Sequence, residues 1–274
     1  MNKIRKINMD KCRPYAKMGR TCKTRAIPEK KVIWPDINKD ILQGKFKIRP
    51  LCRGDINKVV ELWKMSYPEL YGGSHEWMLI PEEYEEKVTM QETWKDDSVN
   101  KKYAMIVIEE IETGNIITAT LFTKDDKNLH VDGTFGAMHP DYRTGKTGIS
   151  LWTEAMAVYK WIEDSGAEYI TFMCETWHPI TQFFAFKQLG FKIAGIFPGQ
   201  FTRWCGGQEE YRACEVHFYK FIGDGAKYTT KHEEWELIPA AKKLWDVLEE
   251  INKESDDEWL RKLKEKSKLA ESRK

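Results

Sequence analysis

The chain has 274 residues and a mass of 32.2 kDa, with 41% hydrophobic and 32% charged residues. This composition supports a folded core and excludes a chain that is disordered throughout. No apolar run approaches the roughly 20 residues that span a bilayer, and residues 1–17 lack the apolar stretch of a signal peptide. We therefore expect a soluble protein of the cytoplasm without membrane contact, built as one large domain with extensions or as two small domains.

Charge is balanced overall but unevenly distributed. The chain has 44 basic and 43 acidic residues, which disfavours nucleic acid as a partner of the whole protein. Residues 1–31 hold eleven basic and two acidic residues, a net charge of +9, and leave 33 basic and 41 acidic residues for the rest. A solvated or loosely docked arm explains this basic segment most simply, and contact with RNA or with an acidic partner is the alternative.

The cysteines predict neither a metal site nor a disulfide. They are Cys12, Cys22, Cys52, Cys174, Cys205 and Cys214. No two of them form a CxxC pair, and no histidine stands at finger spacing, so a structural zinc site is not expected. Without a secretory signal the thiols should stay reduced. Cys174 and Cys214 lie in apolar runs and are interpreted as small core residues.

The first elements follow from local patterns. Residues 1–44 contain three prolines and little periodicity, which predicts an irregular or wrapped arm. Polar and apolar residues alternate over 45–50, which predicts a strand. A helix should follow with Asp55 as its N-cap, because apolar residues then recur at helical spacing. A second helix is predicted over 81–94, with a proline and two acidic residues in its first turn.

The rest of the domain alternates strands with two crossover helices. Strands are predicted where apolar or β-branched runs are bounded by turn residues, at 103–110, 116–123, 129–138, 168–175, 191–197 and 211–221. Helices are predicted at 148–165, closed by Gly166, and at 180–189. This order predicts an α/β (α+β) fold, with a mixed, mostly antiparallel central sheet and helices on both faces.

The two ends of the chain differ from the middle. Beyond Pro239 a helical pattern of apolar residues predicts a helix that docks on the domain, and residues 254–274 predict a marginal helix that frays. We therefore divide the chain into a basic arm at 1–44, a central domain at 45–222 and a helical extension at 223–274.

The segment MHPDYRTGKTG, residues 138–148, carries the clearest chemical signal. A strand ends, a glycine-containing turn follows and a helix begins at once, so unpaired backbone amides and the positive end of the helix dipole form an anion site. Gly145 and Gly148 permit close approach of the backbone to a ligand, and Lys146 adds a cation. The string GKT does not make a P-loop, because Pro140 stands where that motif requires glycine.

The same segment and two others resemble the GNAT acetyltransferase superfamily. KFKIRPLCRGDINKVVELW is similar to the first strand and helix of that family, HPDYRTGKTGIS to its cofactor loop, and FFAFKQLGFKIAG to its late helix and strand. Together they cover residues 45–222. The resemblance implies an enzyme that moves an acyl group, most simply acetyl, from acyl-coenzyme A (acyl-CoA) to an amine by direct attack in a ternary complex. It also implies a set of cofactor-binding residues, namely Met138, Arg143, Thr144, Gly145, Lys146, Thr147 and Gly148.

In that family the fourth and fifth strands splay apart and the pantetheine arm of the cofactor lies between them. The corresponding strands here are 129–138 and 168–175. If the resemblance holds, those strands should separate, and the amides that follow Tyr142 should be free of protein partners.

Three positions depart from the family pattern. Lys146 stands where glycine is usual, Pro179 stands where an asparagine is often found, and Phe186 stands where many members have a tyrosine that acts as general acid. Phenylalanine cannot donate a proton to a thiolate. Another side chain or water must then supply it, or the chain does not run the standard reaction.

Replacement groups for catalysis stand close by in the sequence. Glu175 and His178 follow the fifth strand, and Asp132 lies with His130 on one face of the fourth. His178 is the first candidate for acid or base because its ordinary pKa lies near 6.5. Alternatively, His178 caps the next helix and Asp132 makes a surface pair. Cys174 as an acyl nucleophile is a weaker candidate, since a cysteine inside a strand usually packs.

The acceptor site and the alternatives to acyl transfer follow from these departures and from one further loop. The loop at 66–75 is rich in turn residues and aromatic side chains, and we expect it to line the acceptor site. The functional alternatives to acyl transfer are a GNAT-like domain that binds coenzyme A (CoA) or a partner without catalysis, and other acyl-CoA chemistry such as decarboxylation or hydrolysis. The identity of the amine is not readable, and a homodimer is compatible with the sequence.

Overall fold

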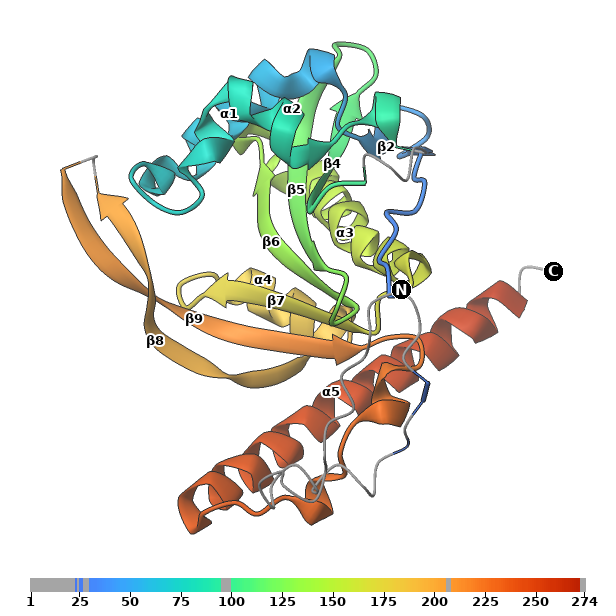
Figure 1. Ribbon diagram of the computed structural model, residues 1–274. Helices are drawn as coiled ribbons and strands as arrows, with labels where there is room; N and C mark the ends of the chain where they lie inside the picture. The colour runs from blue at the N-terminus through green and yellow to red at the C-terminus, as the bar shows by residue number, and fades with distance from the viewer. Residues whose placement is uncertain (1–22, 24, 27–29, 95–99, 206–207, 272–274) are drawn as a thin grey trace.

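The computed structural model describes residues 23, 25–26, 30–94, 100–205 and 208–271, and the side chains of the last helix up to residue 254 and at 261. Most of the basic arm therefore lies outside the described residues, together with Cys12 and Cys22. Figure 1 shows how the described helices and strands are arranged from β1 to the C-terminal helix.

The described strands form one nine-stranded sheet (Figure 1). They are β1 (Lys39–Ile41), β2 (Phe46–Pro50), β3 (Val88–Thr89), β4 (Tyr103–Glu110), β5 (Asn115–Asp125), β6 (His130–Met138), β7 (Tyr169–Glu175), β8 (Lys192–Cys205) and β9 (Glu209–Phe221). They run in the order β1-β2-β4-β5-β6-β7-β9-β8, with β3 beside β4. Only the pairs β6–β7 and β3–β4 are parallel among those described, so the predicted mixed, mostly antiparallel sheet is confirmed.

Helices cover both faces of this sheet, as predicted (Figure 1). One face carries α1 (Ile56–Ser66) and α2 (Tyr84–Lys87), and the other carries α3 (Gly145–Trp161) and α4 (Pro179–Phe183). The buried face of α1 consists of Val59, Val60, Leu62 and Trp63. Burial of each such side chain contributes about 1.5–3 kcal/mol. The helix predicted at 148–165 begins three residues earlier, and Gly166 ends its final turn in the left-handed conformation as expected.

The later part of the arm belongs to the core. The side chains of Val32 and Trp34 are buried, and the Trp34 ring stacks on Trp161 at 5.9 Å. The carbonyl of Val32 accepts a hydrogen bond of 2.6 Å from the ammonium of Lys124. Strand β1 then extends the sheet beyond β2. The arm therefore holds the α3 face in place from residue 30 onward.

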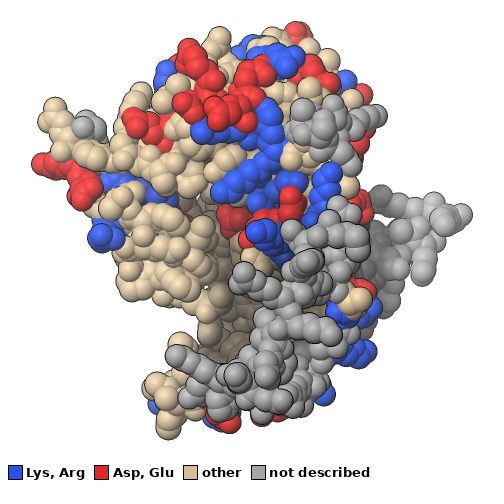
Figure 2. All heavy atoms as spheres, in the orientation of Figure 1, with Lys and Arg blue, Asp and Glu red and all other residues tan. Residues whose placement is uncertain are grey.

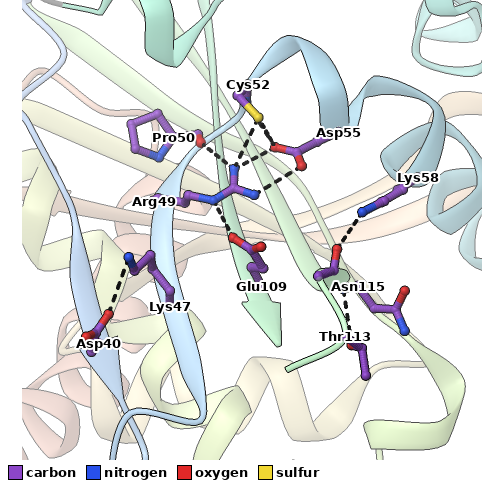
Figure 3. A network of polar contacts seen from close by, with 11 residues as sticks. Asp40, Lys47, Arg49, Pro50, Cys52, Asp55, Lys58, Glu109, Thr113 and Asn115 are labelled. Atoms are coloured by element: carbon purple, nitrogen blue, oxygen red, sulfur yellow. Dashed lines mark hydrogen bonds and ion pairs between the residues drawn. The ribbon is translucent and has the colours of Figure 1, made fainter. Parts of the chain in front are cut away.

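A buried polar network fixes the start of α1 against the sheet (Figure 3). The Arg49 guanidinium donates to Asp55 at 2.6 Å and to Glu109 at 2.7 Å. The Asp55 carboxylate also accepts from the Cys52 amide at 3.0 Å. The sequence predicted that Asp55 caps α1, but its side chain makes no capping hydrogen bond to the helix. Arg49 and the turn before the helix hold the carboxylate instead.

The predicted second helix is largely wrong. Residues 81–94 contain a short 3-10 turn, the four-residue α2, the strand β3 and a second 3-10 turn, in that order. Val88 and Thr89 pair in parallel with Tyr103 and Ala104 of β4. That pairing is distant in sequence and overrides the local helical pattern of this segment.

The last two strands are longer than predicted. The segment 198–210, expected as an excursion, continues the β8–β9 hairpin up to Cys205 and back from Glu209. Pairing shifts between Phe197 and Phe201, so the extra residues form a bulge that keeps the hairpin going. Cys214 lies half-buried on β9.

The C-terminal helix α5 (Pro239–Glu271) docks on the edge strand β8, as predicted for its first part. The Asn252 side chain accepts from the Ile193 amide at 2.8 Å and donates to the Ile193 carbonyl at 3.0 Å. It thereby covers part of a free sheet edge. The helix continues without a break beyond residue 254, where a separate marginal helix was expected. None of the helices in the described part of the chain is both long and apolar enough to cross a membrane.

Candidate functional site

Strands β6 and β7 separate partway along their length. They pair only from His130 to Gly133 on β6 and from Tyr169 to Phe172 on β7. Beyond that point β6 pairs only with β5 and β7 only with β9. The two strands therefore present free backbone edges to each other, which confirms the separation that the sequence predicted.

Two features at one point of the sheet separate the strands. The pairing of β5 with β6 shifts at Thr134, where an extra residue bends β6 away from β7. At the same point the Tyr159 side chain from α3 reaches the sheet beside Gly133. A Cβ atom on Gly133 would lie 2.4 Å from the Tyr159 hydroxyl, so only glycine allows the ring to occupy this place.

A cavity of about 440 Å³ lies in and around the split. We refer to it as the split cavity. Its walls come from the separated ends of β6 and β7, from the first turns of α3, from α4 and from the hairpin. The loop at 66–75 contributes Ser66, Tyr67 and His75 to the lining, and its role in an acceptor site stays a prediction. The Tyr67 hydroxyl donates to the Gly136 carbonyl at 2.6 Å and ties this loop to β6.

One end of the split cavity can receive an anion. Thr144 is the N-cap of α3, yet its side chain makes no capping hydrogen bond, and no acidic residue stands in the first turn. Helix geometry leaves the first amides without intrahelical partners. Gly145 adopts a positive φ of 73°, which turns the chain into the helix, and residues 143–147 are exposed. The Arg143 amide donates to the Pro140 carbonyl at 3.2 Å, so the expectation that every amide after Tyr142 is free is wrong for this residue. The amides that follow Thr144 have the geometry of an anion site, and binding of an anion there stays a prediction.

Arg143 and Gly148 hold the turn in shape. The Arg143 guanidinium donates to the Met138 carbonyl at 2.8 Å and to the Ser66 hydroxyl at 3.2 Å. A Cβ atom on Gly148 would lie 2.4 Å from the Tyr142 carbonyl oxygen. The glycine at 148 is therefore required for packing of α3 against the turn, whereas the sequence suggested close approach to a ligand.

A buried polar cluster lies at another wall of the split cavity. The Arg203 guanidinium from β8 lies 3.3 Å from Glu175 and 3.1 Å from Glu215, which are neighbours on β7 and β9. The Glu215 residue is 3% exposed. Its Oε2 atom has no hydrogen-bond partner among the described residues. One guanidinium thus serves two carboxylates, and one carboxylate oxygen stays unsatisfied.

Burial raises the pKa of both glutamate carboxyls. It raises the pKa of Glu215 to about 7, an effect that Arg203 partly offsets and that the negative charges of Glu175 and Asp132 reinforce. Burial also raises the pKa of Glu175, again against the effect of Arg203. A carboxyl with a pKa near neutrality can accept and release a proton under physiological conditions.

The structure brings two of the three predicted catalytic residues to the split cavity. Glu175 belongs to the buried cluster, and His178 lies exposed at the mouth, where its side chain makes no helix-capping bond. Asp132 lies instead where β6 and β7 are still paired. The hydroxyls of Thr171 and Thr134 donate to its carboxylate at 2.5 and 3.1 Å, and burial raises its pKa.

Cys174 is buried beside this cavity. Its thiol donates weakly to the carbonyls of Glu175 and His178. Burial raises its pKa to about 12, so it stays a thiol near neutral pH and suits the packing role.

Sequence reasoning missed Glu215 and Arg203. Glu215 had a usable signal, because the strand CEVHFYKF alternates polar and apolar residues and places Glu215 and His217 on one face. Arg203 had none, since its segment was read as irregular. Phe186 is buried in the core, on a π-helical turn after α4.

No protein-family model and no curated protein matches the sequence. Solved structures do match. A probable GNAT-family acetyltransferase from Chromobacterium violaceum aligns over 73% of this chain and 93% of its own, with 9% identity and a TM-score of 0.50. A ribosomal-protein-S5-alanine acetyltransferase from Vibrio fischeri covers 69% and 98% at 13% identity with a TM-score of 0.48. A spermidine/spermine N-acetyltransferase from Vibrio cholerae covers 67% and 96% at 14% identity, with a TM-score of 0.47. The chain has the fold of GNAT-family acetyltransferases.

Proposed function

We propose that this protein is an acyl-CoA dependent N-acyltransferase that transfers an acyl group, most simply acetyl, to an amine by direct attack in a ternary complex. The observation that carries the proposal is that a turn suited to an anion and a carboxyl with a raised pKa meet at one cavity. Arg143 and Gly148, at the two ends of the turn whose amides suit a diphosphate, line the split cavity between β6 and β7. The buried carboxyl of Glu215, whose pKa lies near neutrality, lines the same cavity.

The residues at the turn fit the cofactor. The amides that follow Thr144, with Lys146, would hold its diphosphate. The free edges of β6 and β7 would hydrogen-bond the amides of its pantetheine arm much as an added strand does. When bound there, acyl-CoA supplies a thioester carbonyl as the electrophile. Arg143 and Gly148 act indirectly in this proposal, by keeping the turn in shape.

The buried cluster accounts for the nucleophile. An amine in water is mostly protonated and must lose a proton before its nitrogen can attack a carbonyl carbon. The unpartnered Oε2 of Glu215 can accept a hydrogen bond from an ammonium group and then take its proton. Glu175 keeps Arg203 in position, and Asp132 contributes at a distance by raising the pKa of Glu215. The excess of carboxylates over guanidinium favours a cationic acceptor.

A proton must also reach the thiolate that leaves when the carbon–sulfur bond breaks. Phe186 cannot supply it. His178 is exposed at the mouth of the split cavity, so its imidazole can exchange protons with water and donate one to the thiolate. Kinetics of His178→Ala should show the loss of turnover with acyl-CoA affinity retained.

The decisive experiment combines turnover with binding. Release of free thiol from acetyl-CoA is followed over a panel of amines, and cofactor affinity is measured by calorimetry. Glu215→Gln should lower kcat/KM by about 10²–10⁴-fold and leave the affinity for CoA unchanged. Glu210→Gln, a matched change at an exposed position of β9, should have no effect.

The other outcomes separate the alternatives. Binding of acyl-CoA without turnover on any amine would support a non-catalytic GNAT-like domain, which the phenylalanine at 186 favours. Thiol release that needs no amine would indicate hydrolysis. No binding of acyl-CoA at all would overturn the proposed function.

A further inference from the structure

A second cavity, of about 1020 Å³, lies between the C-terminal extension and the end of the sheet where β7 and β8 begin and β9 ends. From the sheet it is lined by Tyr169, Tyr219 and Phe221, and from the extension by residues 232–235 and by Trp245. Figure 2 shows the molecule from the same side as Figure 1, and its surface is recessed in the lower half of this view. The second cavity shares no lining residue with the split cavity.

Aromatic rings form its walls. The rings of Tyr169 and Tyr219 are stacked with centroids 6.0 Å apart. On the opposite wall the rings of Trp235 and Trp245 meet edge to face at 4.7 Å. Electron-rich ring faces attract cations, most strongly those of tryptophan.

Carboxylates accompany these rings. Glu233, Glu234 and Glu249 line the cavity and outnumber its two lysines. The His232 ring nitrogen Nε2 lies 3.3 Å from Glu233 and 3.5 Å from Glu249, so Glu234 is the carboxylate whose contacts leave room for a ligand. Two buried polar atoms there have no hydrogen-bond partner in the described part of the protein, the Oε2 acceptor of Glu234 and the Nε1 donor of Trp245. An unsatisfied buried carboxylate oxygen requires a donor, and an ammonium N–H group is the donor that also matches its charge.

Residues next in sequence to the cavity lining hold a cation of the chain itself in this way. The Arg25 guanidinium lies 4.2 Å from the centre of the Tyr228 ring and forms a bidentate ion pair with Glu168. Both partners are sequence neighbours of residues that line the cavity, Tyr169 and Thr229. A tyrosine ring face and a carboxylate therefore hold the Arg25 guanidinium together.

We propose that the second cavity binds a protonated primary amine, with the ammonium group on Glu234 Oε2 and the alkyl part against the indole rings of Trp235 and Trp245. The Trp245 N–H group remains available for an oxygen acceptor on the same ligand. This site is separate from acyl transfer and does not depend on the proposed function.

The test uses n-butylammonium chloride as the probe and the full chain without acyl-CoA. Indole N–H signals of isotope-labelled protein are followed by NMR, and the Trp245 signal is assigned by its absence in Trp245→Phe. Addition of n-butylammonium should shift this signal with saturation, and the uncharged analogue 1-butanol should not. Glu234→Gln should raise the Kd about fivefold or more, and Glu250→Gln, an exposed neighbour on α5, should leave it unchanged.

Three results would overturn the proposal. One is no shift of the Trp245 signal up to about 50 mM probe. Another is equal binding of 1-butanol, which would show an apolar pocket without selectivity for a cation. The third is a Kd that Glu215→Gln raises and Glu234→Gln does not, which would place the amine in the split cavity.

Discussion

The ionised side chain of Glu215 should lower the free energy of unfolding at neutral and alkaline pH. Burial raises its pKa from 4.5 to about 7. Each pKa unit is worth 1.36 kcal/mol, so the ionised side chain destabilises the folded state by about 3 kcal/mol. The folded state binds the proton more tightly than the unfolded chain does. Stability contributed by this group is therefore present at low pH and is lost as pH rises from 4.5 towards 7.

Glu215→Gln removes this titration and retains the shape and the acceptor oxygen that faces Arg203. Relative to the original protein, the variant should gain about 2.5 kcal/mol of unfolding free energy between pH 5 and pH 8. Guanidinium denaturation at a series of pH values measures the difference directly. Glu210→Gln serves as the control, since the residue is exposed. If the original protein and Glu215→Gln show parallel pH profiles, the carboxyl is ionised normally and the argument for a base of near-neutral pKa is wrong.

Three further changes test the scaffold and the anion site. Arg49→Met leaves the buried Asp55 and the partly buried Glu109 without their counter-charge and should lower the unfolding free energy by about 3–5 kcal/mol, whereas Arg53→Met, at an exposed ion pair, should change it by less than about 1 kcal/mol; equal losses would contradict the assigned network. Gly72→Ala forces a Cβ to 2.4 Å from the indole of β8 and should destabilise more than Gly44→Ala, which has the same positive φ but open space around it; denaturation midpoints compare the two. Lys146→Glu places a carboxylate at the helix amides and should weaken acyl-CoA binding about tenfold by calorimetry; an unchanged Kd would remove the diphosphate from this turn.

The features that the sequence predicted well are those with local causes. The turn at 138–148 was found because a strand, two glycines and a helix start follow one another within a few residues. The positions of seven of the nine described strands followed from apolar or alternating runs between turns, whereas β1 and β3 were not predicted. The helix over 81–94 failed for the opposite reason, because Val88 and Thr89 pair with β4 across a segment that no local pattern reveals.

The split cavity could be expected only through family resemblance, since its causes are distant in sequence. Gly133 accepts a ring from Tyr159, which stands on a helix 26 positions later. The buried cluster joins Glu175, Arg203 and Glu215 from three different strands. No spacing rule connects such residues, so their meeting becomes visible only when the sheet is assembled.

The placement of the cluster also explains why it is tolerated. A carboxylate buried without full compensation is expensive, and a core of apolar side chains at the same positions would be more stable. Glu175 and Glu215 are paired neighbours on β7 and β9, directly beside the place where β7 has lost its pairing to β6. At this point β6 no longer lies beside β7, so its side chains do not cover the cluster. The same loss of pairing that opens the cavity therefore leaves a buried carboxylate oxygen of a cavity-lining residue without a partner among the described residues.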